Sequence, residues 1–202
     1  MSTLEALLRE VRACTACAEH LPLGPNPVLR AGRTARILIV GQAPGTRVHH
    51  SGIPWNDPSG DRLRDWLQFD RALFYNSARI AIIPMGFCYP GKGASGDLPP
   101  RPECAPLWHP RLLAELPELQ LQLLVGKYAQ DYYLGTRRQS LAATVRHFEQ
   151  YLPEFFPLPH PSPRNIRWFR NHPWFEAEVL PVLQTRINAI IDRASPGKPP
   201  VS

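Results

Sequence analysis

The chain has 202 residues, a length that suits one domain with a single sizeable core. It contains no run of 18 apolar residues that would cross a membrane, and its N-terminus lacks a secretory pattern, so we expect a cytoplasmic protein. The formal net charge is +6, and only three of the 23 basic residues are lysine. Arginine binds phosphate through paired hydrogen bonds, which favours a polyanionic partner, although a GC-rich genome would explain the same excess.

Helical and strand-like segments alternate along the chain. Residues 2–12 carry leucine and valine at helical spacing, and Ser2 with Glu5 matches a capping box. A second helix is expected to begin at a cap on Ser59 or Asp61 and to run to about Gln68. Further helices are expected at 106–116, 127–134, 140–151 and 174–193, and strands at 36–40, 79–85, 121–125 and 155–158.

This alternation predicts an α/β fold in which helices cover a central, mostly parallel four-stranded sheet, a three-layer α/β/α architecture. We expect a single domain over residues 1–193. The stretch between Tyr89 and Pro110 is rich in proline and glycine, so we expect it to be largely irregular. Residues 194–202 have no core-forming pattern and are expected to be a disordered tail.

The four cysteines form a pattern that suits a metal centre. Two residues separate Cys14 from Cys17, and fifteen separate Cys88 from Cys104. Disulfides are rare in the cytoplasm, whereas four thiolates that include a C-x2-C pair can hold zinc or an iron–sulfur cluster. Zinc sites often use two closely spaced pairs, so the wide second spacing favours a cluster, with zinc and free cysteines as alternatives. A metal centre would fasten the N-terminal helix to the loop after the second strand.

Two loops with chemically useful residues follow strands. The first, GQAPG at 41–45, offers backbone N–H groups that can hold an anion or a carbonyl. The second, HPSPRN at 160–165, places His160 between prolines, where it can stabilise an oxyanion, while Ser162 and Arg164 can clamp phosphate. In a parallel sheet both loops lie at the same edge and can face each other. Each loop taken alone would equally suit an ordinary connection.

The residues between these loops have two explanations each. Trp55 can stack on a flat ring or pack in the core. Asp57 can orient a water molecule or cap a helix near Ser59. The adjacent His49 and His50 are candidates for acid–base chemistry or phosphate contact, or are simply exposed in a loop.

The combination of these motifs resembles the uracil-DNA glycosylase superfamily. GQAPG is similar to its first motif, and HPSP to its second, histidine-bearing motif. LLVGKYAQDYYLG resembles the strand, glycine and helix that precede the second motif in the iron–sulfur branches, families four and five. The resemblance covers nearly the whole chain up to about Asn165. It implies a 4Fe-4S cluster, whose ligands in those branches match Cys14, Cys17, Cys88 and Cys104 in order and approximate spacing.

The resemblance further implies an enzyme that flips a damaged base out of DNA and breaks its N-glycosidic bond. In this interpretation His160 stabilises the base O2 as charge develops, and Arg164 is the candidate plug for the vacated stack. The resemblance places Gly41, Gln42, Ala43 and Trp55 in the base pocket. It places Ser162, Arg164 and Asn165 in contact with the DNA strand.

The sequence departs from the family pattern at two positions. Ala43 stands where the best-known branches have an Asp or Asn that activates water. Family five has an aromatic residue followed by Asp-x-Ser-Gly. Trp55 and the segment from Asp57 to Gly60 resemble this pattern with a one-residue gap, which implies that Asp57 activates the water instead. Pro84 stands where the iron–sulfur branches have an Asn that reads the base, which leaves Met85, Gly86 and Phe87 to shape that wall.

Two functions follow from these observations. The first is a monomeric DNA glycosylase of base-excision repair, which removes uracil or another deaminated or damaged base and has no membrane partner. The second is a relative without glycosylase activity that binds a base, nucleotide or nucleic acid through the same pocket. Asp57, His160 and Trp55 favour the enzyme, whereas Ala43 and Pro84 favour the binding protein. A third function, a redox sensor built on the cluster, has no support beyond the cysteines.

Overall fold

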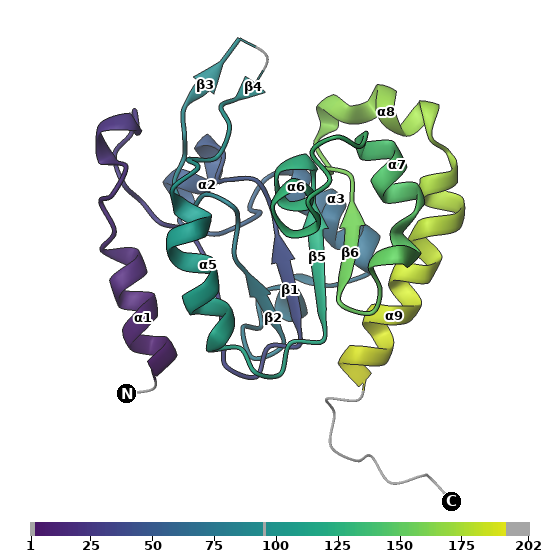
Figure 1. Cartoon of the computed structure of the whole chain (residues 1–202), viewed down its shortest axis with the longest axis horizontal. Helices are drawn as coiled ribbons and strands as arrows, with labels where there is room; N and C mark the ends of the chain where they lie inside the picture. The colour runs from purple at the N-terminus through teal and green to yellow at the C-terminus, as the bar shows by residue number, and fades with distance from the viewer. Residues whose placement is uncertain (1–2, 95, 193–202) are drawn as a thin grey trace, which may run out of the picture.

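A four-stranded parallel sheet forms the centre of the molecule (Figure 1). In the computed structural model, which describes residues 3–94 and 96–192, the strand order is β2-β1-β5-β6. Every neighbouring pair is parallel, and Leu123 of β5 lies opposite Ile39 of β1 and Phe156 of β6. The four strands are β1 Ile37–Val40, β2 Ile80–Ile82, β5 Leu121–Val125 and β6 Phe155–Leu158. The expected strands are therefore all present, and the sheet is parallel throughout.

Helices cover both faces of this sheet, which confirms the three-layer α/β/α architecture (Figure 1). One face packs against α3, α7 and α9, and the other against α1, α5 and α6. The helices are α1 Thr3–Arg12, α2 Thr46–Ser51, α3 Pro58–Leu67, α4 Arg71–Phe74, α5 Cys104–Ala114, α6 Lys127–Leu134, α7 Leu141–Arg146, α8 Ile166–Asn171 and α9 Leu180–Asp192. A π-helical segment, Phe175–Val179, leads directly into α9.

The alternation of side chains along β1 produces the two layers. Ile37 and Ile39 join the core on the side of α3 and α9, while Leu38 and Val40 join the core on the side of α1 and α5. None of these four side chains is exposed to solvent. Such a continuous apolar run is typical of a parallel strand that helices cover on both faces.

Several elements differ from those expected. Helix α3 begins at Pro58 because its cap is Asp57, whose Oδ1 accepts a hydrogen bond from the Gly60 N–H at 2.8 Å. The histidine pair lies in the short helix α2 and not in a loop. Residues 140–151 form α7 and then a separate 3-10 turn, Phe148–Tyr151, in place of one helix.

The segment from 89 to 110 contains more regular structure than its composition predicts. The short strands β3 (Lys92–Gly93) and β4 (Gly96–Asp97) pair in an antiparallel hairpin, and α5 begins at Cys104. A hairpin with two residues on each side is too short to show a hydrophobic alternation in the sequence. The expected Ser2 cap and the expected tail at 194–202 lie outside the described residues.

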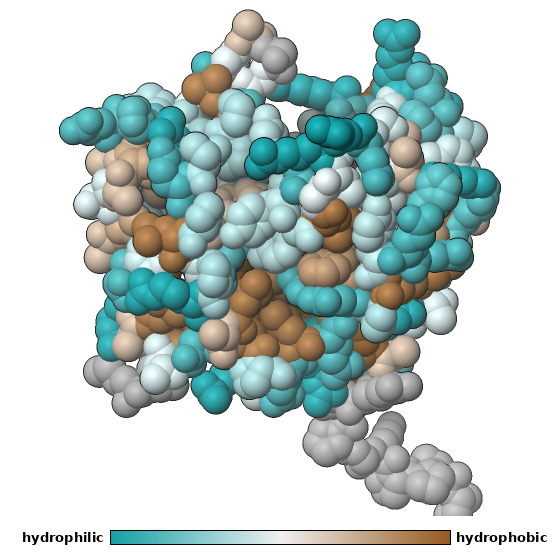
Figure 2. Space-filling view, in the orientation of Figure 1, coloured by the Kyte–Doolittle hydropathy of each residue, from teal (hydrophilic) through white to brown (hydrophobic). Residues whose placement is uncertain are grey.

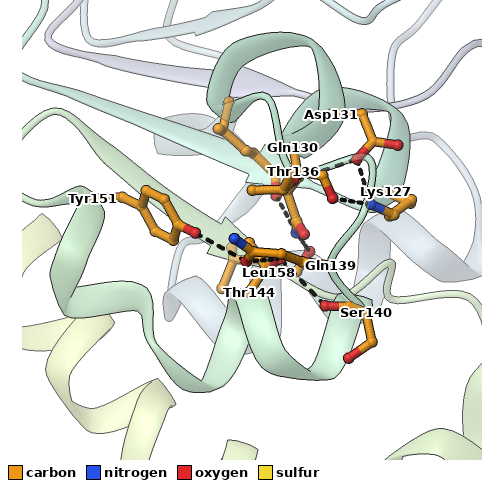
Figure 3. A network of polar contacts seen from close by, with 10 residues as sticks. Lys127, Gln130, Asp131, Thr136, Gln139, Ser140, Thr144, Tyr151 and Leu158 are labelled. Atoms are coloured by element: carbon orange, nitrogen blue, oxygen red, sulfur yellow. Dashed lines mark hydrogen bonds and ion pairs between the residues drawn. The ribbon is translucent and has the colours of Figure 1, made fainter.

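The buried side chain of Gln130 ties the end of β5 to the end of β6 (Figure 3). Its Nε2 donates hydrogen bonds to the carbonyl oxygens of Leu124, at 3.2 Å, and Leu158, at 2.9 Å. Beside it, Lys127 donates to the Thr136 carbonyl and closes the turn after α6. Because Leu158 is the last residue of β6, Gln130 supports the point at which the chain leaves the sheet.

The surface of the molecule is uneven in character. In Figure 2 the region over α7 and α8 is largely hydrophilic, while hydrophobic side chains gather in the lower centre of the same face. Among the described residues, no helix is both long and apolar enough to cross a membrane.

We expect Gln130→Leu to lower the free energy of unfolding by about 1–3 kcal/mol, because it removes both hydrogen bonds and leaves the Leu124 carbonyl without this donor. Denaturant unfolding measures this change. Gln150→Leu, at an exposed position, is the matched control and should stay within about 0.5 kcal/mol of the parent. Equal effects at the two positions would contradict the role assigned to Gln130.

Candidate functional site

A cavity of about 370 Å³ lies at the carboxyl ends of the strands, between the loops that follow β1 and β6. This is the edge at which open parallel sheets place ligands. Nine residues that the sequence analysis assigned to the site line it, and they come from both loops and from the stretch between β1 and α3. They are Gly41, Gln42, Ala43, Trp55, Asp57, His160, Ser162, Arg164 and Asn165.

Backbone hydrogen bonds hold the first loop in place. The Gly41 carbonyl accepts from the Met85 N–H, and the Gln42 carbonyl from the Gly86 N–H, both at 2.9 Å. The Gln42 side chain donates from Nε2 to the Leu98 carbonyl at 3.2 Å. Its amide is therefore oriented by the segment that follows β4.

Trp55 forms one wall of the cavity and lies against the backbone of Gly41. A Cβ at position 41 would lie 2.7 Å from Cζ2 of the Trp55 ring, so only glycine allows this approach. Trp55 has a φ of +57°, a left-handed conformation that is costly for a bulky residue. The Arg64 guanidinium donates to the Trp55 carbonyl at 3.2 Å, and Gly60 leaves room for the same carbonyl. The ring also packs against the core, which confirms the second of the two explanations given for Trp55.

His160 faces this wall, with its ring 5.6 Å from that of Trp55. Its Nδ1 accepts a hydrogen bond from the Ser162 N–H at 3.2 Å, and its carbonyl accepts from Asn165 Nδ2 at 2.8 Å. Burial lowers the pKa of His160, and the negative charge of Asp57 raises it by less. The imidazole is therefore neutral near pH 7, and because Nδ1 is an acceptor, the proton resides on Nε2.

Asp57 caps a helix, which is one of the two roles that its sequence position suggested. Its Oδ1 caps α3, yet the residue also lines the cavity that contains His160. A carboxylate has about four acceptor positions, so one hydrogen bond to the helix leaves capacity for a water molecule or a substrate group. The capping bond fixes the carboxylate at the start of α3.

Met85 does not line this cavity, in contrast to the expectation from the sequence. Ile82 and Pro84 form the wall, while Ile83 and Met85 belong to the core on the opposite side. The reason is that side chains along an extended chain point alternately to opposite sides. Met85 contributes its backbone N–H to the first loop and not its side chain to the cavity.

A buried histidine holds the Pro84 wall. His109, which is 1% exposed, bonds the Pro84 carbonyl through Nε2 at 2.9 Å and the Tyr133 hydroxyl through Nδ1 at 2.6 Å. A carbonyl only accepts, so Nε2 carries the proton and Nδ1 accepts from the hydroxyl. Burial lowers the pKa of His109 to about 4.

The β3–β4 hairpin contributes a second carboxylate that the sequence analysis missed. Gly96 and Asp97 line the cavity, and Asp97 Oδ2 lies beside Gly45 of the first loop. Arg164 crosses from the second loop to the same hairpin, where Gly96 leaves space for its guanidinium. The sequence signal was a Gly-Asp pair in a proline-rich stretch, which is common in turns and indicates no ligand by itself.

The four cysteines line one small separate cavity, together with Arg101 and Trp108. Burial raises the pKa of Cys88 to about 11 and that of Cys104 to about 12. Within the described part of the chain, no three His, Cys, Asp or Glu side chains converge on a single point suited to a metal ion. The donor set around the cavity, four thiols from three distant segments, nevertheless fits a centre held by thiolates.

Comparison with known proteins connects these features to a family. Residues 30–184, more than three quarters of the chain, match the family model of the uracil DNA glycosylase superfamily. The matched range contains both cavity loops and two of the four cysteines, Cys88 and Cys104. Among solved structures, the chain is similar to the solution NMR structure of a proposed uracil DNA glycosylase from Methanosarcina acetivorans. The identity is 17%, the TM-score is 0.47, and the match covers 79% of this chain and 98% of that chain.

The lowered pKa of His109 predicts a protein that loses stability in mild acid. Below pH 6.5 the unfolded state takes up a proton at this residue, while the folded state does not until about pH 4. Over that interval we expect a loss of roughly 3 kcal/mol from His109. Denaturant unfolding at pH 7 and pH 5 measures the trend. His109→Gln should show a weaker pH dependence, and the exposed control His147→Gln should leave it unchanged; equal slopes in all three proteins would contradict this.

Proposed function

The chain belongs to the uracil DNA glycosylase superfamily, and from this premise we propose that it hydrolyses the N-glycosidic bond of uracil or another deaminated or damaged base in DNA. The base would be flipped out of the duplex, because the bond is inaccessible within the stack. The observation that carries the proposal is the meeting of Asp57, Trp55 and His160 at one cavity. Its volume, about 370 Å³, is in the range of small-ligand sites.

In the proposed reaction, water adds to the sugar C1′ and the bond from C1′ to the base nitrogen breaks. The bonding electrons leave with the base, so negative charge develops on its carbonyl oxygen. His160 donates Nε2–H to that oxygen, and its neutral state suits a donor that stabilises charge without giving up its proton. Asp57 orients the water and accepts its proton, and the departing base anion is protonated by solvent.

Positively charged side chains near the cavity suit a DNA strand. Arg164, Arg167 and Arg170 are exposed on the second loop and on α8, and the apolar side chain of Ile166 is 48% exposed among them. Arginines of this kind bind phosphates and position the strand, while base contacts are left to the cavity. With Arg164 lying against the hairpin, Ile166 is a second candidate to fill the vacated stack.

We also propose that Cys14, Cys17, Cys88 and Cys104 hold a 4Fe-4S cluster, with zinc as the alternative. Support comes from the four thiols that line one cavity and from the match of their order to the iron–sulfur branches. Bound there, the group would supply a cross-link between the N-terminal segment, the stretch after β2 and the start of α5.

The binding-only alternative keeps one supporting observation. The wall that would read the base is formed by the apolar side chains of Ile82 and Pro84, and the Pro84 carbonyl already bonds His109. Such a wall offers no hydrogen bond to a base edge, so recognition must come from other residues.

A glycosylase assay on the purified protein tests the proposal. Labelled oligonucleotides with uracil, hypoxanthine, xanthine or an ethenobase are incubated and then treated with alkali, which cleaves abasic sites. We expect cleavage with at least one of them, and about a 10²-fold or larger loss with Asp57→Asn or His160→Ala. Asp65→Asn, on the exposed side of α3, is the control for Asp57 and should keep its rate.

Binding without cleavage on every substrate would reject the enzyme and support the binding-only alternative. If either variant stays within threefold of the parent, the corresponding residue leaves the mechanism.

Asp97 is expected to influence which base is accepted. A carboxylate accepts hydrogen bonds and repels carbonyl oxygens, and the edge of uracil carries a carbonyl on each side of its N–H. Asp97→Asn supplies an amide donor, so uracil excision should become about threefold faster or more. The same oligonucleotide assay measures the rate, with Asp65→Asn again as the control. An unchanged or slower rate would exclude Asp97 from base recognition.

A further inference from the structure

Two buried N–H donors at the cysteine cavity have no hydrogen-bond partner among the described residues. They are Nε1 of Trp108 and Nε of Arg101, and both residues line the cavity with the four cysteines. Trp108 is 4% exposed, so water does not readily replace a partner there. A buried donor without an acceptor costs about 1–3 kcal/mol, which makes two at one small cavity unusual.

Two backbone donors already point at sulfur in the same place. The Phe87 N–H donates to Cys104 Sγ at 3.4 Å, and the backbone N–H of Asn26 donates to Cys88. The cavity is therefore surrounded by N–H groups as well as by thiols. This combination suits an anionic sulfur centre, because hydrogen bonds from N–H groups stabilise negative charge on sulfur.

Neighbouring contacts hold the two side chains in place. The Arg111 guanidinium lies over the Trp108 ring, 5.0 Å from its centroid, and Arg111 is itself paired with Glu10 of α1. Arg101 pairs through Nη2 with Glu103 at 2.7 Å, and its buried Nε has no partner among the described residues. Both side chains are thus held by contacts with residues other than the cysteines.

We infer that Trp108 and Arg101 donate N–H···S hydrogen bonds to the sulfur atoms of a metal centre held by the four cysteines. The inference rests on the proposed centre and is independent of glycosylase activity. Its chemical consequence has a definite sign. Reduction adds negative charge to an iron–sulfur cluster, so these donors favour the reduced state and raise the reduction potential. For any thiolate centre they also slow the loss of metal.

The test uses the full chain, reconstituted anaerobically with ferrous iron and sulfide. Its variants are Trp108→Phe, which keeps an aromatic ring without the N–H, and Arg101→Lys, which keeps the charge without Nε–H. Trp66→Phe is the matched control, since Trp66 is equally buried but belongs to the core on the opposite face of the sheet. The readouts are the reduction potential, followed by visible absorption, and the rate at which a chelator removes the metal.

We expect Trp108→Phe to shift the equilibrium between oxidised and reduced cluster about tenfold toward the oxidised form, a potential lower by 59 mV for one electron. Metal release should become several-fold faster in Trp108→Phe and Arg101→Lys and stay unchanged in Trp66→Phe. If the protein takes up only zinc, the rate of zinc release is the single test of the inference, and it should again be several-fold faster in Trp108→Phe and Arg101→Lys than in the parent. If Trp108→Phe does not fold, the metal release rate of Arg101→Lys tests the inference in its place.

Three results would overturn the inference. The first is that the protein takes up neither iron nor zinc. The second is that both variants keep the reduction potential and the metal release rate of the parent. The third is an equal change in Trp66→Phe, which would indicate a general packing effect. A shifted potential in Trp108→Phe together with no excision by the parent protein would reject the proposed function and leave this inference standing.

Discussion

The parallel pairing of β1, β5 and β6 is the constraint on which the rest of the structure depends. Parallel neighbours bring the loops after β1 and β6 to one edge, although about 120 positions separate them in the chain. The bond from the Gly126 N–H to the Leu158 carbonyl, together with Gln130, ends β6 at a defined place. Trp55 follows β1 and His160 follows β6, and their rings meet at this edge.

Burial then determines the chemistry that the cavity can support. An exposed histidine would be partly protonated near neutral pH, whereas the partly buried His160 stays neutral and presents one N–H. The same effect at His109 has a structural result, since its neutral ring donates to the Pro84 carbonyl and accepts from Tyr133. One physical cause therefore prepares both a candidate catalytic donor and the Pro84 wall of the same cavity.

A single stretch of chain, from Cys88 to Cys104, reaches both cavities. Its ends lie at the cysteine site, while Asp97 lines the larger cavity and the Leu98 carbonyl accepts from Gln42. A metal centre that fixes the two cysteines would also shorten the free length of this stretch, which limits the positions open to the hairpin. The cysteine site thus bears on the shape of the candidate active site without containing any of its groups.

The sequence by itself determined the features that depend on local pattern. The four strands were predicted because a short apolar run between turn residues identifies a buried strand, and the two loops were found because each directly follows such a run. The helix at 127–134 was also predicted, and in the structure Gly126, with a φ of +90°, precedes its first residue.

Only the tertiary structure decided which side chains meet. It showed that Asp57 caps α3 and also lines the cavity, that Met85 points to the opposite core, and that Asp97 enters through a hairpin too short to predict. It likewise placed Trp108 beside the cysteines. These facts depend on the packing of segments distant in the chain, and local periodicity contains no information about which distant segment will lie opposite.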